Sequence, residues 1–270
     1  MISQKQIEEY QANGAICIRG AVQPAMVQTM LEQLDRHRAS GGDPATAETR
    51  ELAFSDRYLY RNHAWMRDFI FRAGIAEIAG RLMVSRTARV YFDHVFMRDG
   101  GTSATTPWHQ DRPYWPFRGR QIASVWVALT PSDDNSSAVH FVRGSHRWEK
   151  VYKPQAFGTK AVWASDAIGE EIPDFWQDRQ GHELLSWATE PGDVVVFGGD
   201  ILHAAGRNAA RDRRRAALSI RYLGDDVSWD PRSGTDPIIT QDDVKIRPGE
   251  LASGDENAFP LAWQLQDGPA

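Results

Sequence analysis

VYFDHVFM, residues 90–97, is the stretch that decides the fold, because it begins the part of the chain where the hydrophobic pattern changes from a helical period to a period of two. This change predicts a β-strand over these residues. The same pattern predicts four further strands, over residues 122–129, 139–142, 194–197 and 215–223. Clusters of glycine and proline lie between them and predict the connecting turns.

No helix-length pattern intervenes regularly between these strands, so a parallel α/β sheet is not expected. An antiparallel barrel or double sheet fits better, which makes the fold mainly β with flanking helices packed on its outside. Helices are expected near the N-terminus, over residues 3–11, 24–37 and 65–82.

A single domain is expected over residues 1–270, because no repeat and no linker interrupts the chain. Its parts are a helical segment over about residues 1–85, a β core over about 86–223 and a C-terminal wrap over 224–270. Within the core, residues 155–180 have mixed character and are expected to pass over the mouth of the barrel.

The composition excludes several classes of protein. Hydrophobic residues make up 41% of the chain and charged residues 25%, which argues against a largely disordered protein. The net charge of -5 gives no indication of a nucleic-acid partner. A single cysteine, Cys17, excludes an internal disulfide and a thiolate-rich zinc site.

No apolar run approaches the ~18 residues that a membrane helix needs, and the N-terminus lacks the apolar core of a signal peptide. We therefore expect a cytoplasmic protein with no membrane partner. The sequence carries no signal for the oligomeric state.

The first candidate ligands are His109 and Asp111, in the stretch Pro107-Trp108-His109-Gln110-Asp111. In an extended chain their side chains project from the same face, roughly 6–7 Å apart along the strand. Both could reach one metal ion at ~2.0–2.2 Å. A hydrogen-bonded surface pair is the alternative interpretation of this short pattern.

A third candidate ligand, His203, follows the predicted strand 194–197 and a glycine-rich turn. A structural histidine at a strand end is the alternative here. Two histidines and one carboxylate on an antiparallel barrel are, however, the ligand set of the non-haem Fe(II) oxygenases. Such a set leaves three octahedral positions open, two for a chelating 2-oxo acid and one for dioxygen.

A 2-oxo acid with a second carboxylate needs a cation near the third ligand. In strand 215–223, alternation places Arg215, Ser219 and Arg221 on the face opposite to the apolar residues. Because a planar guanidinium can hold a carboxylate through two hydrogen bonds, Arg215 is favoured for this role. Arg214 is the alternative if the register differs by one residue.

Five stretches of the chain, in this order and spacing, resemble the phytanoyl-CoA dioxygenase-like family of Fe(II)/2-oxoglutarate oxygenases, which also includes ectoine hydroxylases. They are Thr105–Trp115, Ser124–Leu129, Phe141–Arg147, Pro191–His203 and Arg214–Tyr222. The resemblance covers about residues 88–223 and is far more specific than the His-x-Asp pattern alone.

The resemblance implies a double-stranded β-helix (jelly-roll) core. It implies that His109, Asp111 and His203 are the iron ligands and the catalytic centre, and that Arg215 anchors 2-oxoglutarate. It further implies that Trp126 lies beside the co-substrate and that Trp115 lines the substrate side.

One position departs from some relatives, which carry a serine two residues after the third ligand, where this chain has Ala205. The co-substrate anchor is therefore expected to be weaker or to be assembled differently. Asp111 is intact, and halogenating relatives replace this carboxylate by a small residue, so halogenation is disfavoured.

The function that the resemblance implies is an Fe(II)- and 2-oxoglutarate-dependent dioxygenase. It would use O2 to hydroxylate a C–H bond of a small molecule, releasing succinate and carbon dioxide. Two alternatives remain: a cupin-like Zn(II) or Mn(II) enzyme that is not an oxygenase, and a catalytically silent module that binds 2-oxoglutarate.

Arginines near the metal motif indicate an anionic substrate; they are Arg98, Arg112, Arg118 and Arg120. Arg98 or His94, which share one face of the first strand, is expected to contact that substrate. The acidic turn over residues 133–137 is expected to be solvated.

Overall fold

The computed structural model describes residues 2–50, 52–154, 169–177, 181–235 and 238–266. Most of the segment 155–180, expected over the mouth of the barrel, therefore lies outside the described residues.

Helices and strands follow the predicted division into an N-terminal helical part and a β core. The helices are α1 (Gln4–Asn13), α2 (Pro24–Ala39), α3 (Ala64–Arg72) and α4 (Ile75–Met83). The strands are β1 (Ala15–Ile18), β2 (Glu48–Arg50), β3 (Ala53–Arg57), β4 (Thr87–Arg98), β5 (Thr106–His109), β6 (Phe117–Arg118), β7 (Ile122–Ala128), β8 (Val139–Val142), β9 (Leu184–Leu185), β10 (Val194–Gly198), β11 (His203–Ala205), β12 (Arg215–Leu223), β13 (Ser228–Trp229) and β14 (Leu261–Gln264).

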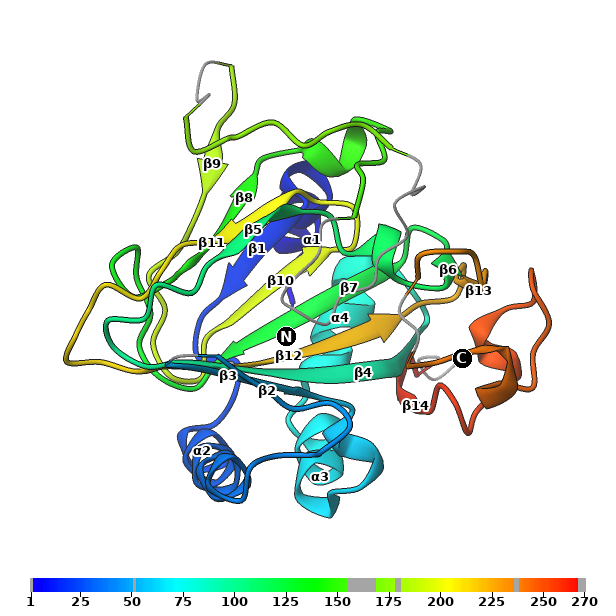
Figure 1. Cartoon of the computed structure of the whole chain (residues 1–270). Coiled ribbons are helices and arrows are strands. Elements are labelled where there is room, and N and C mark those ends of the chain that lie inside the picture. The colour runs from blue at the N-terminus through cyan, green and yellow to red at the C-terminus, as the bar shows by residue number, and fades with distance from the viewer. Residues whose placement is uncertain (1, 51, 155–168, 178–180, 236–237, 267–270) are drawn as a thin grey trace.

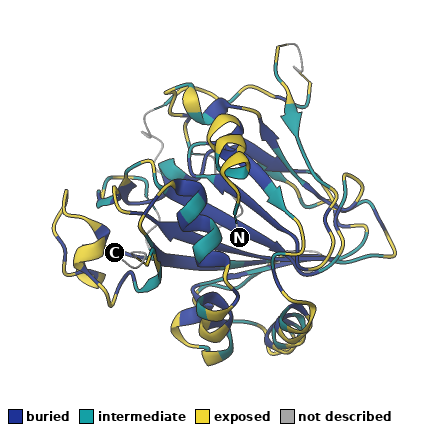
Figure 2. Ribbon diagram, turned by 180° about the vertical axis from the view of Figure 1, so that it is seen from behind, coloured by how far each residue is buried: buried dark blue, intermediate teal, exposed yellow. Residues whose placement is uncertain are grey.

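Two antiparallel sheets form the core. The larger has the order β1-β10-β7-β12-β4-β3-β2, with β14 also paired to β4, and the smaller has the order β5-β11-β8-β9. In Figure 1 the smaller sheet lies above the larger one, and α2 and α3 lie below it. The central strands of the larger sheet, β4, β7, β10 and β12, are largely buried, whereas α2 and α3 expose their outward faces (Figure 2). The predicted fold class, mainly β with flanking helices, is confirmed.

The N-terminal part differs from the prediction in two places. The prediction of a single helix over residues 65–82 is wrong, because two helices, α3 and α4, occupy this stretch. Gly74 separates them at a φ of 74°, a left-handed conformation that glycine adopts at little cost. Strands β2 and β3 were not predicted. Strand β3 forms by pairing with β4, from Ala53 opposite Arg98 to Arg57 opposite His94, and β2 forms by pairing with β3, so neither strand depends on a local pattern.

Strand β12 separates the helical side of the larger sheet from the space between the sheets. The apolar side chains at even positions of residues 216–222 pack in the core cluster that includes α4. Ala217, on the other face, packs with Trp126 and Phe141 between the sheets. The predicted alternation is confirmed, and it places the odd-numbered residues of this strand, including both arginines, on the inner face.

The C-terminal wrap joins the core through β14, which pairs with the start of β4, Trp263 lying opposite Ala88. The backbone N–H of Val90 also donates to the carbonyl of Pro260 at 2.9 Å. We propose on this basis that residues 1–270 form one domain.

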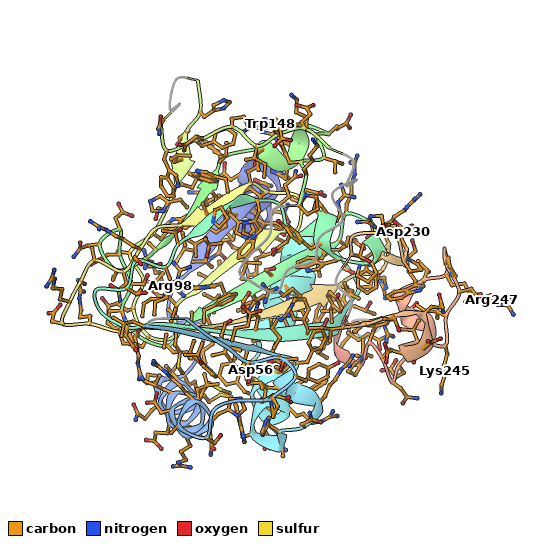
Figure 3. The ribbon with its side chains drawn as sticks, in the orientation of Figure 1. Asp56, Arg98, Trp148, Asp230, Lys245 and Arg247 are labelled. Carbon is orange, nitrogen blue, oxygen red and sulfur yellow. The ribbon has the colours of Figure 1, made fainter. Side chains whose placement is uncertain are left out.

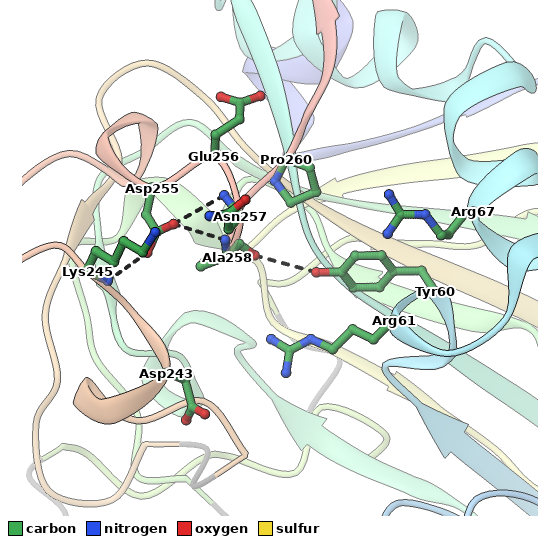
Figure 4. A pocket seen from close by; sticks show the side chains of 10 residues that line it. All are labelled: Tyr60, Arg61, Arg67, Asp243, Lys245, Asp255, Glu256, Asn257, Ala258 and Pro260. Atoms are coloured by element: carbon green, nitrogen blue, oxygen red, sulfur yellow. Dashed lines mark hydrogen bonds between the residues drawn. The ribbon is translucent and has the colours of Figure 1, made fainter.

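A surface hollow of about 460 Å³ lies between this wrap and the segment before α3. The Tyr60 hydroxyl donates to the carbonyl of Ala258 there, and Asp255 accepts from the backbone N–H groups of Lys245 and Ala258 (Figure 4). No predicted site residue lines this hollow, and backbone groups already satisfy its buried carboxylate.

Candidate functional site

The three predicted metal ligands meet at one point. His109 ends β5 and lies opposite His203, the first residue of β11, in the register of the smaller sheet. Asp111 follows β5 by two residues. Its Oδ1 atom lies 3.4 Å from Nε2 of His109 and 3.8 Å from Nε2 of His203. One ligand atom from each side chain can be chosen so that all three lie within 4.8 Å of one another.

Backbone carbonyls orient both imidazoles. Nδ1 of His109 lies 2.9 Å from the carbonyl of Pro107, and Nδ1 of His203 lies 3.1 Å from that of Ile201. A carbonyl can only accept, so each Nδ1 carries the proton and donates it. The Nε2 atom of each ring then lies on the side that faces Asp111, as in metal sites whose histidine ligands are hydrogen-bonded through Nδ1.

The site favours the protonation states that bind a cation. Burial, followed by the neighbouring His109, lowers the pKa of His203 to about 3. Burial alone would raise the pKa of Asp111, but the neighbouring His203, His109 and Arg221 outweigh it and lower the pKa. A neutral imidazole and an ionised carboxylate are the forms that ligate a divalent metal.

A fourth group, Ser124 on β7 of the larger sheet, is hydrogen-bonded to the carboxylate of Asp111. Its hydroxyl donates to Oδ2 of Asp111 at 3.2 Å, and its side chain is fully buried. Oδ1 of Asp111 is therefore left to face the two histidines. This residue was not predicted as a site residue, and a serine within an apolar strand is the only signal that indicated it.

Arg215 lies at the other end of the inner face, as predicted. It is 2% exposed, and its Nη2 donates to the hydroxyl of Ser137 at 3.1 Å. Its guanidinium carbon lies 5.7 Å from the Trp126 ring. Nε and Nη1 have no hydrogen-bond partner among the described residues. Arg214 instead pairs with Asp35 of α2 at 2.5 Å, so the alternative register does not occur.

Figure 3 labels Arg98, which lies at the end of β4. In the register of β12 and β4 it is directly opposite Arg215. It donates to the hydroxyls of Ser137 and Thr106 and to the carbonyl of Gly206, all at 2.6–2.7 Å. Burial lowers the pKa of Arg98 to about 10, and burial together with Arg98 lowers that of Arg215. Two buried cations with no carboxylate partner among the described residues make a receptor for an anion.

The hydroxyl of Ser137 is hydrogen-bonded to both Arg98 and Arg215. The prediction that the turn over residues 133–137 is solvated is wrong for its last two residues. The turn residues Ser136 and Ser137 are 0% and 1% exposed. Ser137 has a φ of 68°, and its hydroxyl accepts from both guanidinium groups and donates to the carbonyl of Gly206. It places a hydroxyl beside Arg215, where Ala205 offers none. That the co-substrate anchor is assembled differently from that of some relatives stays a prediction.

The other arginines near the metal motif do not gather at the site. Arg112 pairs with Asp200 and Arg118 with Asp230, and the Arg120 side chain is 88% exposed. The predicted role of Arg98 in substrate binding stays a prediction, although its position beside Arg215 indicates a different role.

Trp115 lies on the inner face near a different arginine. The guanidinium carbon of Arg221 is 5.9 Å from the Trp115 ring and 4.6 Å from the Phe92 ring. The sequence placed Arg221 on the inner face but gave it no role.

A model of the phytanoyl-CoA dioxygenase (PhyH) family matches residues 10–216, more than half of the chain. The chain belongs to this family. Among family relatives, the dioxygenase lolE1 of Epichloe uncinata is 27% identical over 233 residues, which are 82% of this chain and 82% of that protein. The peroxisomal phytanoyl-CoA dioxygenase of Rattus norvegicus is 28% identical over 137 residues, 50% of this chain and 38% of that one.

The fold also matches solved structures. The epimerase SnoN, whose crystal structure is a complex with Fe3+, alpha ketoglutarate and nogalamycin RO, has a TM-score of 0.73 at 20% identity, covering 96% of this chain and 98% of that one. The double-stranded β-helix core is confirmed. Membership of the PhyH family and the His-Asp-His cluster confirm the predicted class, an Fe(II)- and 2-oxoglutarate-dependent dioxygenase.

Within the described part of the chain, the helices of this family member are too short or too polar to cross a bilayer. The cytoplasmic location stays a prediction.

Proposed function

We propose that this dioxygenase hydroxylates a C–H bond of a small molecule, with His109, Asp111 and His203 as its iron ligands. The observation that carries the proposal is the convergence of these three buried side chains from two strands and a turn, with the Nε2 atoms and one carboxylate oxygen facing one another. Two imidazoles and one carboxylate suit Fe(II) and leave three octahedral positions for other ligands.

When bound, Fe(II) and 2-oxoglutarate together activate O2 for oxidation of the substrate, with release of succinate and carbon dioxide. The residues of this chain hold and orient the reactants. Arg215, with Arg98 and Ser137, would bind the distal carboxylate of 2-oxoglutarate, since its Nε and Nη1 point at no other acceptor among the described residues. Trp126 would cover this end of the co-substrate.

Trp115 would line the substrate side. Its ring is 3% exposed and packs edge-on against Tyr91 and Phe92. A wall of this kind limits the access of water to the reacting atoms, which protects an oxidising centre from side reactions. An anionic substrate remains part of the proposal and is developed below.

The proposal is tested by anaerobic titration of the purified protein with Fe(II) and 2-oxoglutarate. A weak visible charge-transfer band is expected from the chelate in the wild type and no band in His109→Ala. Absence of the band in the wild type, or its persistence in the variant, contradicts the assignment. A cupin-like enzyme that is not an oxygenase needs no interior arginine, so 2-oxoglutarate binding that depends on Arg215 contradicts this alternative. A catalytically silent module would release no succinate when oxygen and candidate substrates are added, so succinate release contradicts that one.

Replacing Ser124 by alanine is expected to weaken Fe(II) binding by about 10-fold, because groups that orient a metal ligand are worth about 10- to 100-fold in metal affinity. The lost contact is the hydrogen bond to Oδ2 of Asp111. Competition with a chelator measures the Fe(II) dissociation constant. Ser132→Ala is the matched control, because Ser132 is also buried but its hydroxyl has no partner in the described structure. An equal loss in both variants contradicts the role of Ser124.

A further inference from the structure

Arg221 is a buried cation that is neither a proposed metal ligand nor part of the proposed co-substrate anchor. It is 5% exposed, and among the described residues its Nη1 donates only to the carbonyl of Ser219, on its own strand, at 3.2 Å. Nε has no partner in the described part of the chain. Burial lowers its pKa, as expected where no carboxylate contacts the guanidinium.

The two carboxylates whose charges act on Arg221 are engaged elsewhere. Asp93 lies on the opposite face of β4 and accepts from the backbone N–H groups of Leu59 and Tyr60 at 3.1 and 2.9 Å. Asp111 accepts from Ser124 and faces the two histidines, where the metal would neutralise it. With the metal bound, Arg221 is left as an uncompensated charge in a low-dielectric site.

The position of Arg221 separates it from the co-substrate anchor and brings it to the metal. It follows Arg215 by six residues on β12, so their Cα atoms are roughly 20 Å apart at ~3.3 Å per residue. In the register of β12 and β7, Arg221 lies opposite Ser124, which contacts Asp111. One 2-oxoglutarate held at Arg215 therefore leaves Arg221 free for another molecule.

The surroundings of Arg221 are apolar and partly open. Its guanidinium carbon lies 4.6 Å from the Phe92 ring and 5.9 Å from the rings of Phe96 and Trp115. On β4, the inner-face residues His94 and Phe96 keep accessible surface, whereas Val95 on the outer face between them is fully buried. Solvent therefore reaches the inner face beside this cation.

We propose that Arg221 binds the carboxylate of the substrate and that Phe92, Phe96 and Trp115 contact the apolar carbon skeleton attached to it. The proposal rests on the proposed function and names its substrate class: a small apolar molecule with a carboxylate close to the carbon that is oxidised. A guanidinium with a free Nε edge beside aromatic rings suits a carboxylate on an apolar group.

The test uses two pairs of probes that differ in charge but hardly in shape: acetate with acetamide, and phenylacetate with phenylacetamide. Each is titrated anaerobically into protein saturated with Fe(II) and 2-oxoglutarate. Paramagnetic relaxation of the probe protons by Fe(II), with Zn(II) protein as the diamagnetic reference, measures binding near the metal. The wild type is expected to bind each acid at least about 10-fold more tightly than its amide, as charge-assisted hydrogen bonds predict.

Arg221→Gln is expected to weaken binding of both acids about 10-fold and to leave the amides unchanged. Arg221→Lys is expected to lose less, because it keeps the charge without the planar fork. Arg120→Gln is the matched control, since it removes the same charge from a side chain that is 88% exposed. If Arg221→Gln does not fold, as judged by loss of the charge-transfer band, Arg221→Lys carries the comparison.

Three results overturn the inference. The first is equal binding of acid and amide to the wild type, and the second is an equal loss of acid binding in Arg120→Gln. The third is a probe that shifts the charge-transfer band alike in wild type and Arg221→Gln, which indicates binding to the metal itself. The band also separates this inference from the proposed function. No band in the wild type contradicts the proposed function, whereas an intact band without charge discrimination contradicts only the role of Arg221.

Discussion

His203→Ala is expected to abolish the charge-transfer band with Fe(II) and 2-oxoglutarate and to reduce succinate release by more than about 100-fold. The lower bound follows from the 10- to 100-fold that even groups behind a metal ligand contribute, because His203 would contact the metal itself. Its Nε2 lies 3.8 Å from Oδ1 of Asp111, and apart from His109 no other histidine of the described structure joins this cluster.

The control for this variant is His140→Ala. His140 lies on β8, paired with β11 next to His203, so the two substitutions perturb the same sheet. Its Nε2, however, lies 3.1 Å from Asp134, whose side chain is 79% exposed, and so faces away from the cluster. A band of wild-type intensity in His203→Ala, or equal loss in both variants, contradicts the assignment of His203 as a ligand.

Arg215→Leu is expected to weaken 2-oxoglutarate binding by about 100-fold, roughly 3 kcal/mol, a typical cost of removing one partner from a buried hydrogen-bonded charge pair. The measured loss should exceed the net binding energy of the pair between Arg215 and the carboxylate. The reason is that the carboxylate would stay buried with Arg98 as its one remaining cation. The dissociation constant is read from the charge-transfer band. Binding of 2-oxobutyrate, which lacks the distal carboxylate, should change little.

Arg214→Leu provides the matched control, since it removes the same charge one residue earlier. Arg214 is part-exposed and pairs with Asp35 on α2, and surface pairs are worth only about 0–1 kcal/mol. The 2-oxoglutarate dissociation constant is therefore expected to stay within about 3-fold of the wild type, as that small pair energy implies. If Arg214→Leu loses more affinity than Arg215→Leu, the anchor is on the other residue.

The sequence predicted the parts of the site that depend on the spacing of residues within one stretch of the chain. His109 and Asp111 are two residues apart, and alternation along residues 215–223 favoured Arg215 for the inner face. Arg214 stayed the alternative until its ion pair with Asp35 excluded it. The sequence offered His203 as a candidate, and the resemblance implied that it joins the other two ligands. Only the structure shows the pairing of β11 with β5 that places it opposite His109.

The parts that the sequence missed depend on contacts between distant segments. Ser137 lies in a polar turn whose local pattern indicates solvent, and only the packing of β12 and β4 beneath it brings it to two guanidinium groups. Arg221 was placed correctly, but its aromatic surroundings come from β4 and from the turn after β5. Strand β3 likewise exists because β4 offers an edge to pair with.

Both inner arginines belong to β12, a strand that is buried along its whole length and hydrogen-bonded to β4 and β7 on its two sides. A strand that is hydrogen-bonded on both sides cannot lengthen or shorten, so the spacing between Arg215 and Arg221 is constant. If Arg221 fixes the acid end of a substrate, the regiochemistry of the reaction follows: the oxidised carbon is selected by the number of bonds that separate it from that acid, and not by which of its C–H bonds is weakest.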